Sequence, residues 1–461
     1  MALTPDQWLN RLAQAMDVRA SRIAILRSYM DGDAPLPEGA DGCRDAYKDF
    51  QRKSRTNFGE LIVDAVCERM IPSGFSVAGA SEDDDQLRAI WKRNELQLGI
   101  SDVLRDMIGL SAGYLIVSEE STGKALVSCE RPEQAITEQS ASRPNQVRAG
   151  LKVYRDEIEN SDFAFLHLPG AVFPYVRPLT NVSLTQTYGV PIRGIAGGWV
   201  PFLNDDGSHG NATGLDFVPV FPFVNRSGKG EFETHTDILD RINWNILQRL
   251  VITAMQAYRQ RAVEGSLPTE DDEGNPIDYK ELFKPGPGAL WQLPDGVKLW
   301  ESSQTDITAS LSANKDDITH LAAVSRTPMS TLIPDGANQS AEGAAFAKEG
   351  LTFKAGDRVV RASSPLARAM GAALAIERGQ SSIVVDIEVL WLPVERQSLA
   401  EKADAATKAQ DLPWRTRMTD IWQFSGDRVD QLETERASDA LNASLALPIP
   451  DISVTSDTAQ A

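Results

Sequence analysis

The sequence predicts an α+β chain in which helices predominate. Residues 236–263 contain neither glycine nor proline, and residues 340–377 are rich in alanine, so each segment indicates a long helix. Residues 125–225 instead carry short β-branched and aromatic runs separated by turn residues, which is typical of strands. Because helices and strands do not alternate regularly along the chain, a doubly wound sheet is not expected.

The first predicted helix covers residues 4–29. Thr4 is suited to the N-cap and Pro5 to the first helical position. Trp8 and Leu12 begin an apolar stripe at helical spacing, so one face of this helix should be buried.

Shorter elements fill the rest of the N-terminal half. Glycine, proline and aspartate mark residues 30–42 as a loop. The pattern then predicts helices at residues 58–69, from residue 81 onward and at 100–110, and strands at residues 71–77 and 114–117. Four strand-bearing runs follow: LVSCERP, RAGLKVYRD, DFAFLHLPGAVFPYVRP and FVPVFPFVN.

The C-terminal half is predicted to be mostly helical. Residues 265–305 form a turn-rich insert that interrupts two helices, and Asp306 or Thr305 would cap the second of them, at 306–325. Next come a loop with two prolines at 327–339, the helix at 340–377 that crosses Pro365, a strand at 382–392, and helices at 398–410, 414–424 and 428–444.

The charge balance argues against tight binding of nucleic acid. The net charge is −19, and lysine and arginine are dispersed among carboxylates rather than gathered in a basic patch. An acidic wall would still let a duplex slide past, because it repels phosphate. No apolar run approaches the ~18 residues of a membrane span, so no membrane partner is expected.

The search for reactive chemistry finds little. The four histidines lie in no metal-binding motif, and neither a P-loop nor a GxSxG sequence is present. Cys43, Cys67 and Cys129 are widely spaced and fit reduced thiols. The sequence therefore predicts a protein that is not an enzyme and uses no cofactor or metal.

Two long helices around a compact insert suggest two interpretations. The first helix carries apolar residues, among them Ile246, Leu250 and Ile252, which stay exposed unless a neighbour covers them. Repetition of the helix pair around a ring would bury these faces and enclose a channel. An antiparallel helical hairpin inside an ordinary monomer is the other interpretation.

Several local sequences occur in an order that resembles the one found in a known family. These sequences are SYMDGDAPLP, FGELIVDAVCERMIPSGFSV, IWKRNELQ, the strand at 113–117, VPVFPFVNRSGKGEFETHTDILDRINWNILQRLVI, SRTPMSTLIP and QSAEGAAFAKEGL. In this order the chain is similar to the portal, or head-to-tail connector, proteins of long-tailed bacteriophages. The similarity is greatest to portals of phages that infect Gram-positive and actinobacterial hosts.

The resemblance implies an architecture for each part of the chain. Residues 1–235 would form the wing, and residues 236–264 the first stem helix. The clip would cover 265–305, the second stem helix 306–326 and the tunnel loop 327–339. The wing's long helix and strand would follow at 340–396, the crown at 397–445 and a flexible tail at 446–461.

The resemblance also implies roles for single residues. Beside the DNA, in and next to the tunnel loop, would lie Arg326, Thr327, Met329, Ser330, Asn338 and Gln339. Between subunits of the stem would lie Ile246, Leu250 and Ile252. The clip would bind its partners through Tyr279, Phe283 and Trp291.

The implied function is that of a ring-shaped DNA channel at one capsid vertex, used in genome packaging, head–tail joining and DNA ejection. The implied partners are other copies of the chain in a homododecamer, the major capsid protein, the terminase packaging motor, a head-completion or tail adaptor, and double-stranded DNA passing without sequence specificity. The protein would act in the virion, after assembly in the host cytoplasm. Two alternatives stay open: another head–tail adaptor or minor capsid protein, and an intracellular enzyme of unknown type.

Overall fold

Helix α1 (Pro5–Met30) connects the two larger hydrophobic cores of the molecule in this computed structural model. The structure describes residues 3–37, 45–77, 81–120, 122–179, 194–257, 261–267, 269–270, 274, 276–279, 297–301, 306–333, 341–395, 399–424 and 426–445. Trp8 and Leu12 of α1 lie in the smaller core, whereas Ile23 and Leu26 lie in the main core. The expected cap is confirmed, because Thr4 Oγ1 accepts a hydrogen bond from Gln7 N.

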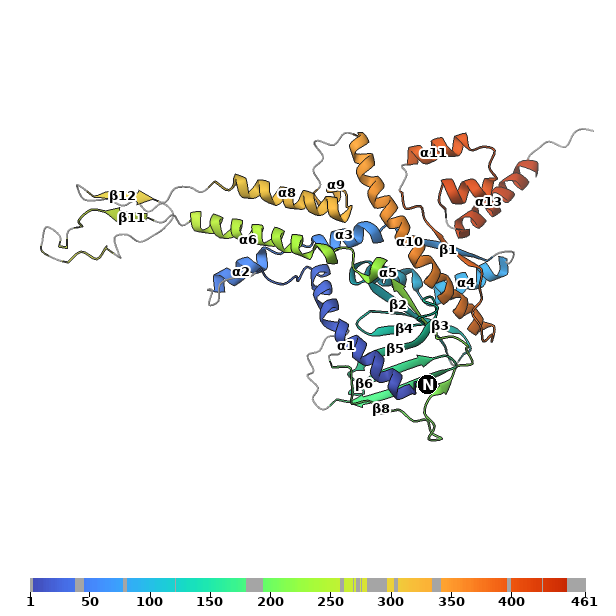
Figure 1. Cartoon of the computed structure of the whole chain (residues 1–461). Coiled ribbons are helices and arrows are strands. Elements are labelled where there is room, and N and C mark those ends of the chain that lie inside the picture. The colour runs from blue at the N-terminus through green and yellow to red at the C-terminus, as the bar shows by residue number, and fades with distance from the viewer. Residues whose placement is uncertain are drawn as a thin grey trace, which may run out of the picture.

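The smaller core lies between α1 and an antiparallel sheet of six strands. The strand order is β4 (Ala135–Gln139), β5 (Val147–Asp156), β6 (Ser161–Leu168), β7 (Ala171–Pro178), β8 (Val200–Pro201), with β9 (Asn211–Ala212) also paired to β7. Alternate residues such as Leu151, Val153 and Leu166 point into this core. Figure 1 shows α1 lying across the sheet.

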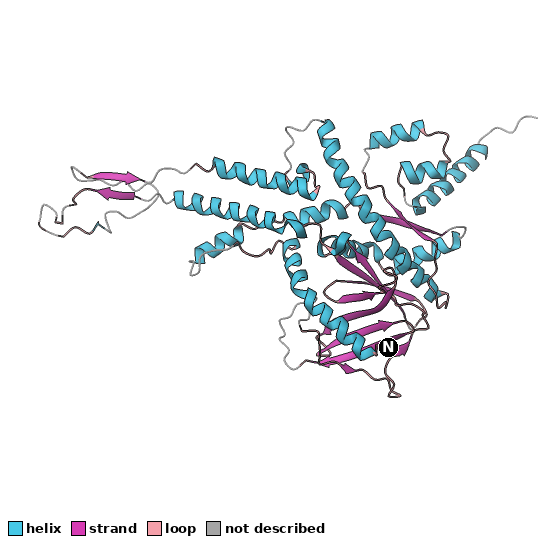
Figure 2. Ribbon diagram, in the orientation of Figure 1, coloured by secondary structure: helices cyan, strands magenta, loops and turns pink. Residues whose placement is uncertain are grey.

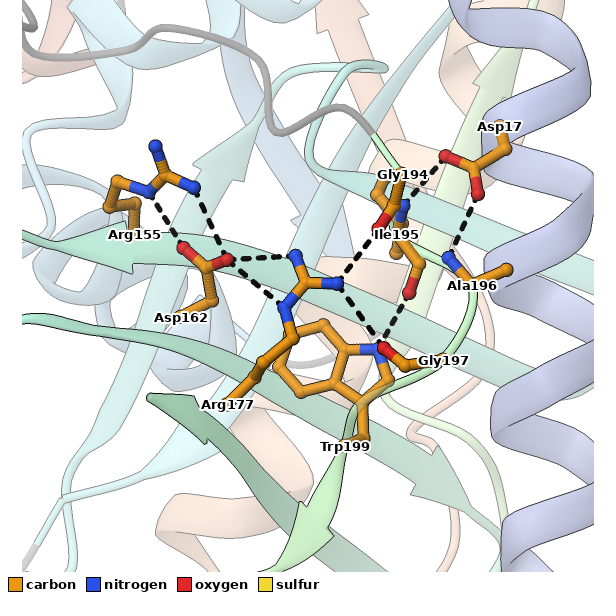
Figure 3. A network of polar contacts seen from close by, with 9 residues as sticks. All are labelled: Asp17, Arg155, Asp162, Arg177, Gly194, Ile195, Ala196, Gly197 and Trp199. Atoms are coloured by element: carbon orange, nitrogen blue, oxygen red, sulfur yellow. Dashed lines mark hydrogen bonds and ion pairs between the residues drawn. The ribbon is translucent and has the colours of Figure 1, made fainter. Parts of the chain in front are cut away.

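A buried carboxylate joins neighbouring strands of this sheet. Asp162 on β6 is 0% exposed and accepts hydrogen bonds from Arg155 Nε at 2.7 Å and Arg177 Nη2 at 2.8 Å. Arg155 comes from β5 and Arg177 from β7, so one side chain links three strands (Figure 3). Charged groups tolerate burial when they are paired in this way.

The same network fastens the segment at residues 194–199. Arg177 donates to the carbonyl oxygen of Gly194 at 2.7 Å, and its guanidinium lies 4.7 Å from the centre of the Trp199 ring. On the other side, Asp17 of α1 accepts from the backbone nitrogens of Ile195 and Ala196, both at 2.8 Å (Figure 3). The segment is therefore held to the sheet and to α1 at once.

The main core gathers elements from both ends of the chain. Its sheet has the order β10 (Val220–Val224), β2 (Ala112–Glu119), β3 (Ala125–Glu130). Around it pack α3 (Phe58–Cys67), α5 (Leu96–Leu110) and the long helix α10 (Ala341–Glu377). Pro365 lies inside α10, as the sequence predicts, and Leu366 directly after it is fully buried.

A second junction joins early and late parts of the chain. Strand β1 (Pro72–Val77) pairs with β13 (Ile387–Trp391), and α4 (Ser81–Arg93) packs beside them. The predicted strand at 382–392 is too long, because residues 382–386 run along α10 instead. There Val384 N donates to the carbonyl oxygen of Gly371.

The C-terminal helices confirm the predicted helical end of the chain. They are α11 (Leu399–Lys408), α12 (Trp414–Thr416) continued by the π-helical turn η3 (Arg417–Ile421), and α13 (Gly426–Leu445). Arg415 holds α13 to this group through Asp430 and Glu433. Helix α2 (Asp45–Lys53) was not predicted, and Figure 2 shows it beside the projecting part of the molecule.

The buried His167 predicts a pH dependence of stability. Burial, helped by Lys152, lowers the pKa of His167 from 6.5 to about 4. Below pH 6.5 the unfolded chain therefore binds a proton that the folded chain does not. We expect about 3 kcal/mol of unfolding free energy to be lost between pH 6.5 and 4, at ~1.4 kcal/mol per pH unit.

Melting temperatures at pH 7 and pH 4 test this expectation. The variant His167→Leu keeps the site apolar and cannot titrate, so its melting temperature should fall less on acidification than that of the wild type. Equal falls in the two proteins would show that His167 is not held neutral in the fold.

Candidate functional site

Two helices leave the body together and form its most prominent projection. They are α6 (Thr236–Ala257) and α8 (Thr308–Ser325). Figure 1 shows them side by side, with strands β11 (Arg261–Glu264) and β12 (Lys298–Glu301) at their far end. Asp306 Oδ1 accepts from Thr308 N at 2.8 Å, so the predicted aspartate is hydrogen-bonded at the start of α8.

The base of α6 is fixed in the main core. Leu239 and Ile242 are buried there. The buried Asn243 accepts hydrogen bonds through Oδ1 from Thr56 N at 2.9 Å and Thr56 Oγ1 at 2.7 Å. Tyr29 at the end of α1 donates to Asp240 Oδ1. These contacts set the direction in which α6 leaves the body.

Asp317 holds the two projecting helices together. Its Oδ1 accepts from Arg241 Nε at 2.8 Å and its Oδ2 from Asn245 Nδ2 at 2.7 Å. Directly after it, Ile318 and Leu321 turn the base of α8 into the main core. One carboxylate thus bridges α8 to two successive turns of α6.

The outer halves of the pair are only partly covered by the described residues of the chain. Leu247 is the last fully buried side chain among those described in α6, and Leu311 on α8 is 44% exposed. Of the three residues predicted to lie between subunits, Ile246 packs partly on the main core, while Leu250 and Ile252 beyond it are partly exposed. All three lie on the projection.

The far end of the pair differs from the prediction. The first helix was expected to reach residue 263, but α6 ends at Ala257 and β11 (Arg261–Glu264) follows. This strand pairs with β12 (Lys298–Glu301), which places Val263 opposite Leu299 and opposite charges at both ends of the ladder. Such cross-strand pairs stabilise a hairpin over a continued helix. Two strands therefore close the insert where it meets the helices.

The residues expected to bind clip partners are only partly described. Tyr279 lies in the insert and is half-buried. Phe283 and Trp291 lie outside the described residues, so their role stays a prediction.

The connection from α8 to α10 contains the residues expected to lie near DNA. Arg326 ends α8 in the left-handed conformation with φ 52°, and its side chain is exposed, as is that of Ser330. Thr327 is only 3% exposed, and Met329 in α9 (Met329–Leu332) packs partly on the main core. Asn338 and Gln339 lie outside the described residues. Within the described chain, Arg326 and Ser330 thus present the accessible side chains of this set.

A buried ion cluster joins this connection to the rest of the body. Glu231 lies between two cations of α10, with Oε2 3.0 Å from Lys354 Nζ and Oε1 2.6 Å from Arg358 Nε. All three side chains are less than 10% exposed. Lys354 Nζ also donates to the carbonyl oxygen of Ser325 at 2.9 Å, at the C-terminal end of α8. A positive charge at this end interacts favourably with the helix dipole.

The charges in this cluster stabilise one another. Burial alone would raise the pKa of the Glu231 carboxyl, but Lys354 and Arg358 outweigh it and hold that pKa below its usual value. Burial lowers the pKa of the Lys354 ammonium, Glu231 opposes that effect, and the positive charges of Arg358 and Arg326 add to it. The cluster was missed in the sequence, because its members are far apart along the chain and match no motif.

Within the described parts of the chain, no group of three or more histidine, cysteine, aspartate or glutamate side chains is placed to hold a metal ion. Cys67 and Cys129 are free thiols, and burial raises the pKa of Cys129 to about 12. No described helix combines the length and apolar character needed to cross a bilayer.

Comparison with known proteins identifies the family. The sequence model of the family described as "Phage portal protein, SPP1 Gp6-like" matches residues 9–440. The portal protein of Mycobacterium phage D29 is 22% identical over 374 residues, which cover 77% of this chain and 72% of the relative. Because the family model matches most of its length, the chain belongs to the phage portal protein family.

Two solved structures of gene transfer agent particles are also similar, each at 12% identity. A chain in the virion of the native particle aligns with a TM-score of 0.40 and covers 87% of this chain and 97% of its own length. A chain in the neck of the native particle, with C12 symmetry, aligns with a TM-score of 0.44 and covers 86% and 98%.

Family membership confirms the phage portal function that the resemblance implied. The protein is a phage portal protein, a structural component of the virion at the capsid vertex.

The ion cluster generates a prediction about stability. In Glu231→Gln, the cations Lys354 and Arg358 lose their shared buried anion, so we expect the unfolding free energy to fall by about 3 kcal/mol or more. Denaturant unfolding at pH 7 measures this. The control is Glu349→Gln, an exposed position on α10, the helix that carries Lys354 and Arg358, and it should unfold like the wild type.

The same cluster predicts acid sensitivity. Because the pKa of Glu231 is lowered in the fold, its stabilising effect is complete above its unfolded pKa of 4.5 and disappears as the pH falls through the folded value. The difference in stability between wild type and Glu231→Gln should therefore shrink below pH 4.5. A difference that stays constant down to pH 3 would contradict the assigned charges.

Proposed function

We propose that copies of this chain assemble into a ring whose central channel passes double-stranded DNA during packaging and ejection. The observation that carries the proposal is the projecting pair α6 and α8, whose outer apolar side chains Leu250, Ile252 and Leu311 stay partly exposed within the described chain. Neighbouring pairs would cover each other in a closed ring. The family resemblance puts the ring at twelve copies.

In this proposal the pair is the stem and the insert closed by β11 and β12 is the clip. The body up to residue 235, with α10 and β13, is the wing, residues 327–339 are the tunnel loop, and residues 397–445 are the crown. The two-stranded closure of the insert supports a clip that is a separate module from the helices. The clip would meet the packaging motor, and later a head-completion or tail adaptor, while the wing would contact the major capsid protein.

The proposed channel handles DNA mainly by shape and repulsion. A chain of net charge −19 repeated around a ring concentrates negative potential, which prevents the duplex from adhering to the wall. The exposed Arg326 beside the tunnel loop would supply weak and exchangeable phosphate contacts. The chain itself is proposed to hydrolyse nothing, so the work of packaging would come from the motor.

Electron microscopy of the purified protein tests the ring directly. We expect negatively stained particles with a central hole, and a mass in light scattering that matches about twelve copies. A monomer that persists across salt concentrations would refute the proposal.

A stem variant tests the placement of the interface. Leu250→Asp should impair ring formation, since an aspartate placed between subunits costs roughly 2 kcal/mol or more per interface. Its circular dichroism spectrum should match that of the wild type, because Leu250 lies beyond the buried base of α6. The exposed neighbour Gln248→Asp carries the same charge change and should form rings. Normal rings from Leu250→Asp would show that the stem is assigned wrongly.

A further inference from the structure

Helix α10 buries one side and leaves the opposite side open. Leu351 and Ala355 on the buried side are 0% exposed. On the other side, Phe353 is 68% exposed and Val360 is 72% exposed. At ~1.5 Å per residue these two side chains lie about 10 Å apart along the helix axis. Large apolar side chains in such open positions on a buried helix indicate a surface that another molecule covers.

Two glycines extend this open side. Gly350 and Gly356 lie within about 120° of arc that also contains Phe353 and Val360, at ~100° per residue. A Cβ added at either glycine would meet nothing within 4 Å. Glycine weakens a helix interior, and no contact within the described chain requires it here. Close approach of another backbone would require it.

A cationic pocket adjoins this face. Its volume is about 210 Å³, and its rim includes Phe353 and Val324, which is 50% exposed. Its charged lining consists of four cations and two carboxylates: Arg226, Arg326, Lys354, Arg358, Glu231 and Asp357. Arg226 and Arg326 are exposed, and neither pairs with a carboxylate among the described residues. The pocket is therefore a local excess of positive charge on an acidic chain.

We propose that the open face of α10 is where the next copy of the chain packs, and that the pocket beside it receives a carboxylate of that copy. This inference rests on the proposed ring and names one of its contact surfaces. The contact lies on the body, next to the C-terminal end of α8, and not along the outer part of the stem. The glycines admit the neighbour's backbone, Phe353 and Val360 supply apolar area, and Arg226 and Arg326 supply the free positive charge.

The chemistry of the face favours a protein partner over DNA. A phosphate could enter the pocket, but a duplex backbone would leave Val324, Phe353 and Val360 in water. A protein surface that bears a carboxylate covers both parts of the face. With its net charge of −19, a second copy of the chain has acidic surface to offer.

The charge of the face also determines the kind of contact. Two copies that met pocket to pocket would bring their unpaired arginines together, which is unfavourable. The proposed contact therefore joins the face to a different surface of its neighbour, so it is heterologous. Heterologous contacts related by a rotation close into rings.

Assembly measured by sedimentation velocity over a range of protein concentrations tests the inference. Phe353→Asp and Arg326→Glu should each need roughly tenfold or more protein for half assembly, as expected when a contact residue is replaced by an unfavourable charge. Matched controls are Ile158→Asp, at a turn 94% exposed between β5 and β6, and Lys124→Glu, exposed between β2 and β3. Both controls should assemble like the wild type.

Gly356→Leu separates assembly from folding. Leucine favours the helix over glycine, so the melting temperature of this variant should not fall below that of the wild type. Its bulk should nevertheless prevent close approach of the neighbour and reduce assembly. A variant that is as stable as the wild type and assembles equally well would overturn the proposed contact.

The outcomes distinguish this inference from the ring itself. Rings formed by the wild type and equally by all three face variants would leave the ring intact and overturn the contact. A wild type that never assembles would overturn both. If Arg326→Glu assembles like the wild type, the pocket does not receive the neighbour's carboxylate and the inference is wrong. Weaker binding of a duplex oligonucleotide by the same variant in fluorescence anisotropy would then leave Arg326 only the phosphate contacts proposed above.

Discussion

The carboxylate of Glu231 is the point on which the geometry of the projection depends. It lies just before α6, it pairs with Lys354 and Arg358 of α10, and Lys354 also binds the last carbonyl of α8. Three segments that are distant in the sequence thus share one anchor. Buried charges need this mutual compensation. If one of the three segments moved without the others, it would leave unpaired charges in the protein interior, which is costly. The direction of the projection and the start of the connection after α8 are consequently coupled.

Such an anchor suits the proposed stem, which would transmit force between the proposed clip and wing. The base of α6 is held by Asn243 and its partner Thr56, and the pair of helices by Asp317. Polar contacts of fixed geometry resist sliding better than apolar packing alone. Many cations of the acidic chain are used in this way, as in the pairing of Arg27 with Asp106 and Glu133. Arginines paired with carboxylates are not available to phosphates, which agrees with the proposed channel wall that binds DNA weakly.

The sequence predicts the local elements well and the long-range ones poorly. Helix α1 follows from its own residues, because Thr4, Pro5 and the apolar stripe act within a few turns. The end of α6 does not, since β11 exists only through its pairing with β12 across the insert. The ion cluster around Glu231 and the Arg155–Asp162–Arg177 network likewise depend on which segments meet in space. Periodicity carries no information on such meetings, and only the family resemblance indicated how the segments are arranged.

The pairing of β1 with β13 has a consequence for synthesis on the ribosome. Pro72 has its partner in Trp391, so the sheet edge formed by β1 stays open until most of the chain has been translated. The main core stays incomplete for the same period, because α10 and β13 both contribute to it. A prematurely terminated chain lacks these elements and cannot complete the main core. In the proposed ring, where one defective copy would compromise the whole vertex, incompletely translated chains would therefore be left out of assembly.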